Sequence, residues 1–302
     1  MKHLLSIETL STAELHQILN LAKAMKATRG HHDAHPLRHQ CWAMIFCKSS
    51  TRTRVSFEVG IRELGGDVLF LAADDIQLGR GEPIEDTARV LGRMCHGAVI
   101  RTFAQSDVDE FARFSGIPTI NALTDDEHPC QILADLQTIQ EIHGTFEGKV
   151  VTFVGDGACN VPRSWLWAAA KLNFELRIAA PKQYQPDEEL LQRVRSVGGS
   201  IHVTDDLKAA ADGADVLYTD VWVSMGKEEE AAYRMAQLGG YRIDAELVSL
   251  AKPGALVMHC LPAYRGKEIT AEVFEAHAST IFDQAENRLH AQKAVLSLLA
   301  QC

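Results

Sequence analysis

The fold is decided by residues 150–180, which read VVTFVGDGACNVPRSWLWAAAKLNFELRIAA. The run 150–154 is apolar and stops at a glycine turn, which is typical of a buried parallel strand. A helical segment follows at 163–172, and a second apolar run at 176–180 ends before Pro181. A strand, a helix and a strand in this order predict two parallel strands joined by a crossover helix.

The same alternation continues on both sides of this stretch. Further apolar runs that predict strands lie at residues 42–46, 67–71, 97–102, 215–219 and 255–258. Helices are predicted at residues 50–64 and 84–94, and Ser11 with Glu14 marks the start of an earlier helix. The whole pattern predicts an α/β protein with mainly parallel sheets flanked by helices.

The length of the chain predicts two domains, because 302 residues are too many for one small core. The expected domains are residues 1–135 and 150–284, each a mainly parallel sheet flanked by helices, joined by interdomain helices. One joining helix is predicted at 131–142. The segment 285–302 is predicted as a C-terminal helix that packs back on the N-terminal domain.

The composition excludes several classes of protein. Hydrophobic residues make up 46% of the chain and charged residues 23%, as in ordinary globular domains. The net charge of −10 argues against a nucleic-acid partner, because binding to a phosphate backbone needs a basic surface. The seven cysteines have no C-x-x-C spacing and indicate reduced thiols in a cytoplasmic protein. We expect neither a signal peptide nor a membrane segment, because the apolar stretches are too short.

A cluster of hydroxyl and guanidinium groups follows the run 42–46. Residues 48–54 read KSSTRTR and fall at the start of the helix predicted at 50–64. Free backbone N–H groups and the helix dipole favour anions there, and arginine matches phosphate oxygens in a bidentate manner. The alternative is a capped helix with solvated basic residues. Two arginines interleaved with hydroxyl groups in an acidic protein favour an oxyanion site.

Other polar residues follow other strands, at the ends where ligands bind in parallel sheets. Arg101 ends one strand, although by itself it could be a surface residue. His128 and Gln131 lie three residues apart at a helix start and point the same way, although a lone histidine is more often structural. Asp220 could receive a cationic amine or cap a turn. Cys260 could be a small core residue, the commoner case for a free cysteine.

The glycine turn at 155–160, GDGACN, matches a dinucleotide-binding fingerprint only in part. Asn160 stands where the third glycine would be, and the next strand ends in Ala180 and Pro181 instead of an acid that would hold a ribose hydroxyl. We therefore interpret the segment as a tight turn that presents Asn160, and we expect no nicotinamide cofactor.

Four motifs occur in order along the chain. They are STRTR at 50–54, HPCQ at 128–131, the segment 220–226 that ends in SMG, and HCLP at 259–262. Together they resemble the ornithine enzymes of the aspartate/ornithine carbamoyltransferase family, and the resemblance runs nearly end to end. It implies that a carbamoyl group passes from carbamoyl phosphate to the δ-amine of L-ornithine. The products would be L-citrulline and phosphate, in arginine metabolism.

The resemblance also implies roles for individual residues. Carbamoyl phosphate is expected to contact Ser50, Thr51, Arg52, Thr53, Gln77, Arg101, His128, Gln131, Cys260, Leu261 and Arg288. L-Ornithine is expected to contact Asn160, Asp220, Ser224 and Met225. The expected catalytic residues are Arg52, Arg101, His128, Asp220 and Cys260. Residues 1–135 would then bind carbamoyl phosphate, and residues 150–284 would bind ornithine.

The implied chemistry uses neither a metal nor a cofactor. Thr53, Arg101 and His128 would stabilise the oxyanion that forms on the carbamoyl group, and the attacking amine must be neutral. The family is built on trimers with active sites at subunit interfaces, so a homotrimer or a multiple of trimers is expected. One departure concerns ornithine: the family often has two adjacent asparagines after the glycine turn, and this chain has Cys159 followed by Asn160.

Three alternatives stay open. A carbamoyltransferase could use putrescine, an acylated ornithine or aspartate, although the SMG segment matches the ornithine enzymes. A nicotinamide-dependent dehydrogenase is disfavoured by the incomplete fingerprint. A catalytically silent binding protein is expected to lack at least one of Arg52, Arg101, His128 and Arg288, and all four are present. The sequence does not indicate arginine synthesis or breakdown, because both directions use one active site.

Overall fold

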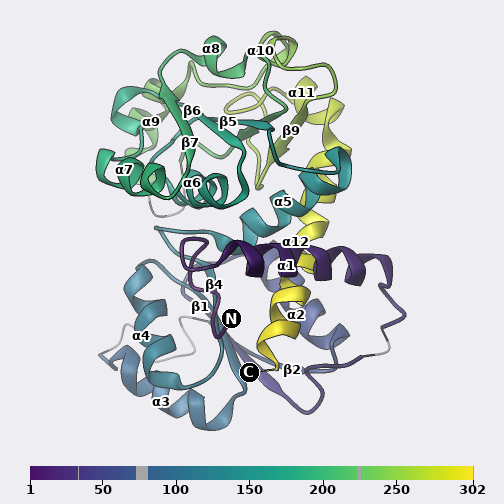
Figure 1. Cartoon of the computed structure of the whole chain (residues 1–302). Coiled ribbons are helices and arrows are strands. Elements are labelled where there is room, and N and C mark those ends of the chain that lie inside the picture. The colour runs from purple at the N-terminus through teal and green to yellow at the C-terminus, as the bar shows by residue number, and fades with distance from the viewer. Residues whose placement is uncertain (33, 73–80, 224–225, 227, 302) are drawn as a thin grey trace. The chain divides into compact units, whose positions relative to one another are not determined.

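The computed structural model describes residues 1–32, 34–72, 81–223, 226 and 228–301. The chain forms two compact units: the first contains Met1–Gln137 and Glu286–Cys302, and the second contains Thr138–Ala285. Each unit is built around its own parallel β-sheet with helices on both faces (Figure 1). This confirms the predicted α/β fold class with two flanked parallel sheets.

The sheet of the first unit has four strands in the order β2-β1-β3-β4. The strands are β1 (Cys41–Phe46), β2 (Asp67–Ala72), β3 (Gly97–Arg101) and β4 (Thr119–Leu123). β1 is central, because it pairs with both β2 and β3. Gly97 lies opposite Trp42, and a Cβ atom on Gly97 would come within 2.5 Å of the Trp42 ring. The glycine therefore makes room for the indole that fills this part of the core.

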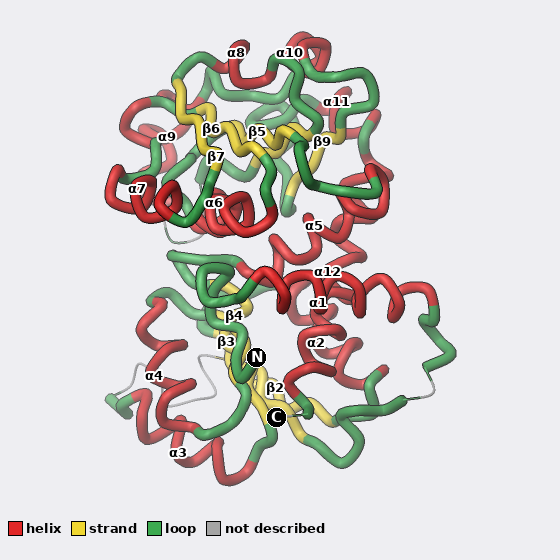
Figure 2. The backbone as a smooth tube through the Cα atoms, in the orientation of Figure 1, coloured by secondary structure: helices red, strands yellow, loops and turns green. Residues whose placement is uncertain are grey.

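Helices cover both faces of this sheet. α3 (Ile84–Met94) and α4 (Gln105–Ser115) pack on one face, where Ile45, Ile100 and Phe111 belong to one buried cluster. The other helices of the unit are α1 (Thr12–Ala27), α2 (Thr51–Glu63), the first part of α5 (Pro129–His143) and the last part of α12 (Ala278–Leu299). Figure 2 shows α1, α2 and α12 on the other side of the strands from α3 and α4.

The sheet of the second unit has five strands in the order β7-β6-β5-β8-β9. The strands are β5 (Val150–Val154), β6 (Glu175–Ala179), β7 (Ser200–Thr204), β8 (Val216–Thr219) and β9 (Leu256–His259). The helices are α6 (Asn160–Leu172), α7 (Glu188–Ser196), α8 (Leu207–Ala211), α9 (Ala231–Leu238), α10 (Ala245–Leu250) and α11 (Ala271–Ala276). One face of the sheet packs Leu217 and Val257 against Phe274, while Trp165 of α6 meets Tyr218 edge-on at 5.6 Å between ring centroids.

Two strands, β4 and β7, were not predicted from the sequence. Residues 119–123 form β4, and its buried Asn121 donates to the Leu5 carbonyl at 2.9 Å. β7 alternates between buried and exposed positions at the edge of its sheet. Polar residues interrupt both strands, so neither forms a continuous apolar run. In the described part of the chain, no helix combines the length and the apolar composition that crossing a membrane requires.

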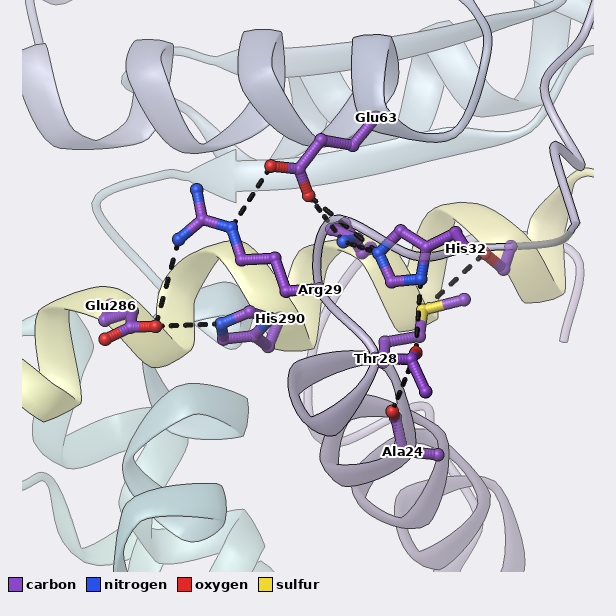
Figure 3. Close-up of polar contacts among 10 residues, drawn as sticks. Ala24, Thr28, Arg29, His32, Glu63, Glu286 and His290 are labelled. Atoms are coloured by element: carbon purple, nitrogen blue, oxygen red, sulfur yellow. Dashed lines mark hydrogen bonds and ion pairs between the residues drawn. The ribbon is translucent and has the colours of Figure 1, made fainter.

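A buried lysine of α12 forms an ion pair with α2 in the first unit. Lys293 is fully buried, donates to Glu63 Oε2 at 2.6 Å and contacts His32. Figure 3 shows Glu63 between His32 and Arg29, and Arg29 Nε donates to Glu63 at 3.2 Å. Burial and the Lys293 charge lower the pKa of His32, which favours a neutral imidazole beside the ammonium. One carboxylate at the end of α2 therefore balances two cations.

We predict that Glu63→Gln lowers the free energy of unfolding of the first unit by about 2–3 kcal/mol, because the buried Lys293 ammonium loses its carboxylate. Glu58→Gln is the matched control on the same helix, because its partners Arg54 and Arg62 are exposed. Its expected cost is below about 1 kcal/mol. Urea unfolding followed by circular dichroism measures both, and equal losses would contradict the role of the buried pair.

Candidate active site

The strand order reverses at one point in each sheet, and the candidate residues follow the strands that flank these points. The reversal lies between β1 and β3 in the first unit and between β5 and β8 in the second. In open parallel sheets, ligands bind outside the carboxyl ends of the strands at such a point. Residues 48–54 follow β1 and Arg101 ends β3, while Asn160 follows β5 and Asp220 follows β8.

The start of α2 carries the predicted oxyanion site. Ser50 is the N-cap residue, and its hydroxyl accepts a hydrogen bond from the Thr53 N–H at 3.3 Å. Thr53 is buried and Arg52 is half-buried, whereas Thr51 and Arg54 are exposed. Arg54 lies 3.7 Å from the centroid of the Phe70 ring, and it pairs with Glu58. Of the two arginines, Arg52 is therefore the one expected to bind an anion, because Arg54 already contacts Phe70 and Glu58 on the surface of the helix.

Arg288 joins two of the predicted motifs, STRTR at 50–54 and HPCQ at 128–131. Its Nη1 donates to Gln131 Oε1 at 2.8 Å, and its Nη2 donates to the Thr53 hydroxyl at 3.2 Å. All three side chains are buried. The Gln131 amide in turn donates to Asp135 at 2.8 Å. The guanidinium of α12 is therefore fixed between the start of α2 and the first turn of α5.

His128 lies among the arginines of the first unit. Both His128 and Arg101 are buried, and the β3–β4 register shifts immediately before Arg101. Burial, together with the positive charges of Arg288, Arg101 and Arg52, holds the pKa of His128 well below its usual range. The imidazole is therefore neutral at neutral pH and can donate one hydrogen bond to a carbonyl oxygen. These four residues were predicted from the sequence to share one site, and in the structure the charges of the three arginines act on the His128 imidazole.

In the second unit, Asp220 and Cys260 meet at the ends of β8 and β9. The Cys260 thiol donates to Asp220 Oδ1 at 2.9 Å, and the same oxygen accepts from the Val221 N–H at 2.7 Å. Burial raises the pKa of Asp220. A carboxylate and a thiol in contact are suited to hold an amine. The carboxylate can accept hydrogen bonds from the amine, and the thiol is a further polar group beside it.

A buried histidine and glutamate support the loop that carries Cys260 and Leu261. His259 Nδ1 accepts from the Leu261 N–H at 2.8 Å, and its Nε2 lies 3.2 Å from Glu268 Oε1. Glu268 also accepts from the Tyr264 N–H at 2.6 Å. The sequence analysis missed Glu268, because a single glutamate after the HCLP motif has no distinctive spacing.

A metal ion does not suit this loop as it is arranged. Atoms of Asp220, His259 and Cys260 that can ligate a metal lie within 4.8 Å of one another. Both ring nitrogens of His259 nevertheless already have hydrogen-bond partners, Leu261 and Glu268. The Cys260 thiol donates its hydrogen bond to Asp220. A metal would have to replace these bonds.

The remaining ornithine candidates lie at the start of α6 and in the SMG segment. Asn160 is the first residue of α6 and is half-buried. Cys159 precedes it, and burial with the nearby Asp156 and Asp220 carboxylates raises the pKa of its thiol well above the usual value. Gln77, Ser224 and Met225 lie outside the described residues.

Two consecutive parts of the chain are similar to the two domains of one known protein family. Residues 2–141 match the carbamoyl-P binding domain of aspartate/ornithine carbamoyltransferases, and residues 147–299 match their Asp/Orn binding domain. The ornithine carbamoyltransferase of Akkermansia muciniphila is 58% identical, with 99% of this chain and 98% of that protein aligned. The relative from Nitratiruptor is 50% identical over 98% of this chain and 97% of that protein.

Two solved structures resemble this one over almost the whole chain. The ornithine carbamoyltransferase from Pyrococcus furiosus has a TM-score of 0.93 at 45% identity, covering 99% of this chain and 97% of that one. The anabolic ornithine carbamoyltransferase from Campylobacter jejuni has a TM-score of 0.94 at 42% identity, covering 100% and 99%. With both family domains matched in order over nearly the whole chain, the chain belongs to the aspartate/ornithine carbamoyltransferase family.

Proposed function

We propose that this chain transfers the carbamoyl group of carbamoyl phosphate to the δ-amine of L-ornithine, giving L-citrulline and phosphate. The observation that carries the proposal is the buried Arg288 guanidinium, which donates to Thr53 and Gln131 next to the start of α2. A fixed cation at a helix N-terminus suits a small phosphorylated substrate. The near full-length similarity to ornithine carbamoyltransferases supports the same pair of substrates.

In this proposal, most contacts with carbamoyl phosphate come from the first unit. The phosphate binds the N–H groups and hydroxyls at the start of α2, together with Arg52 and Arg101. The carbamoyl group is held by His128 and Gln131. The proposed set is completed by Ser50, Thr51, Thr53, Gln77, Cys260, Leu261 and Arg288.

Ornithine is assigned to the second unit. Asp220 and Cys260 orient the side-chain amine, and their mutual hydrogen bond supports this role. Asn160, Asp220, Ser224 and Met225 hold the α-amine and the α-carboxylate. A carboxylate at this point favours an acceptor with a cationic or neutral amine over aspartate, whose second carboxylate would be repelled.

The reaction follows from these positions. The neutral δ-amine attacks the carbamoyl carbon, and negative charge builds on the carbonyl oxygen, where Thr53, Arg101 and His128 stabilise it. The bond from the carbon to the phosphate oxygen breaks, and phosphate leaves toward Arg52. The proton lost by the amine passes to the departing phosphate. Catalysis rests on positioning and fixed charge.

The chain is proposed to act in the cytoplasm, in arginine metabolism, as a homotrimer or a multiple of trimers. Free cysteines throughout the described residues support a reducing compartment. The domain roles follow the family: residues 1–135 bind carbamoyl phosphate, residues 150–284 bind ornithine, and the segment 285–302 returns to the first of these.

The proposal is tested by product formation from purified protein and carbamoyl phosphate with ornithine, putrescine, N-acetylornithine or aspartate supplied separately. We expect a carbamoylated product with ornithine and little with the other three. Turnover of another amine would overturn the acceptor assignment and leave the carbamoyl-phosphate half in place. No turnover with any of them would favour a silent binding protein.

Arg52→Ala is expected to raise the KM for carbamoyl phosphate by about 30-fold or more, because a charge-assisted bond to the phosphate is lost. Arg54→Ala is the matched control, since that side chain stacks on Phe70 and pairs with Glu58. Its KM should stay within about two-fold of the wild type. Initial rates at varied carbamoyl phosphate measure both, and the assignment fails when the two variants behave alike.

Cys260→Ser is expected to impair the use of ornithine more than the binding of carbamoyl phosphate, because the thiol contacts the Asp220 carboxylate. A loss of about 10-fold in kcat/KM for ornithine corresponds to one disturbed hydrogen bond to a charged group. Cys41→Ser, at the half-exposed start of β1, is the control and should match the wild type. Equal losses for both substrates would refute the role of Cys260.

A further inference from the structure

An ion pair that the mechanism does not use lies inside the second unit. Arg234 of α9 donates from Nη1 to Asp156 Oδ2 at 2.7 Å, and the two side chains are only 10% and 7% exposed. Arg234 Nε donates to Glu230 at 2.9 Å, and its guanidinium lies 5.2 Å from the centroid of the Tyr184 ring. The guanidinium is therefore held from three directions.

The Asp156 carboxylate fixes the turn that follows β5. While Oδ2 binds Arg234, Oδ1 accepts from the Ala158 N–H at 3.1 Å. The turn has little freedom elsewhere: Gly155 has a φ of 131°, and a Cβ atom on Gly157 would meet Ile178 at 2.5 Å. Two residues after Ala158, α6 begins with Asn160. The position of Asn160 therefore depends on the orientation of this carboxylate.

The ion pair also lies close to the amine-binding end of the proposed site. The charges of Asp156, Asp220 and Arg234 all act on the Cys159 thiol. Besides burial, the two carboxylates raise the pKa of this thiol, and the guanidinium lowers it. Without Arg234, the buried Asp156 charge would be left uncompensated, and the turn would move to expose the carboxylate to water.

We propose that Arg234 is a positioning residue for ornithine: by holding Asp156, it fixes the turn that presents Asn160. Arg234 acts through Asp156 and does not touch the substrate. The inference rests on the proposed function, because it assumes that Asn160 binds ornithine. Carbamoyl phosphate should be unaffected at its main contacts, which belong to the first unit.

The test is a steady-state comparison of Arg234→Met, Arg234→Lys and the control Arg193→Met. Arg193 is an exposed arginine of the same unit whose guanidinium lies over the Trp167 ring. Arg234→Met should raise the KM for ornithine by about 10-fold or more, with a smaller change in kcat. Arg234→Lys should recover part of this loss, because an ammonium can still pair with Asp156. The control should match the wild type.

Two further readouts separate positioning from general damage. The dissociation constant for carbamoyl phosphate, measured by calorimetry, should stay within about two-fold in all variants. The double variant Arg234→Met/Asp156→Asn should have a lower KM for ornithine than Arg234→Met alone, because the uncompensated charge is gone.

The proposal is overturned if the KM for ornithine is unchanged in Arg234→Met, or if carbamoyl-phosphate binding falls by the same factor. If Arg234→Met does not fold, unchanged ornithine kinetics in Arg234→Lys and in Asp156→Asn overturn it. Failure of the proposed function gives a different result, since the wild type would then form no citrulline from ornithine.

Discussion

The two hydrogen bonds that Arg288 donates join parts of the chain that are far apart in sequence. Thr53 follows the first strand, Gln131 lies in the first turn of the helix that leaves the first unit, and Arg288 lies on the helix that returns to it. The fully buried Lys293, one and a half turns further along α12, fixes the same helix to the end of α2. The C-terminal helix therefore supplies one buried guanidinium to the proposed carbamoyl-phosphate site.

The two units have opposite electrostatic character at their candidate sites. In the first unit, burial and the positive charges of three arginines hold the pKa of the His128 imidazole low, so the group stays neutral and adds a donor without a further charge. In the second unit, the Asp156 carboxylate is paired with Arg234, and the Asp220 carboxylate accepts a hydrogen bond from the Cys260 thiol. A phosphate suits the first arrangement and an amine suits the second. Fixed charges of opposite sign can therefore distinguish the two substrates of the proposed reaction.

The sequence predicted the features that depend on local pattern. Continuous apolar runs located β1 and β5, and Ser11 with Glu14 located the start of α1, where a capping box forms. The edge strand β7 and the polar β4 were missed, because their register comes from neighbouring strands and not from their own composition. Motif order predicted a set of site residues, but the partners of Asp156 and Glu268 could not be predicted, since nothing local links them to Arg234 and His259.

The most direct test of the Arg288 network is a calorimetric titration of carbamoyl phosphate into the wild type and into Arg288→Met, with circular dichroism to verify folding. The account predicts binding weaker by about 30-fold or more in a folded variant, because the guanidinium and its alignment of Thr53 and Gln131 are both lost. Arg288→Lys, which keeps the charge but not the fork, should fall between the two. Wild-type affinity in folded Arg288→Met would contradict the account.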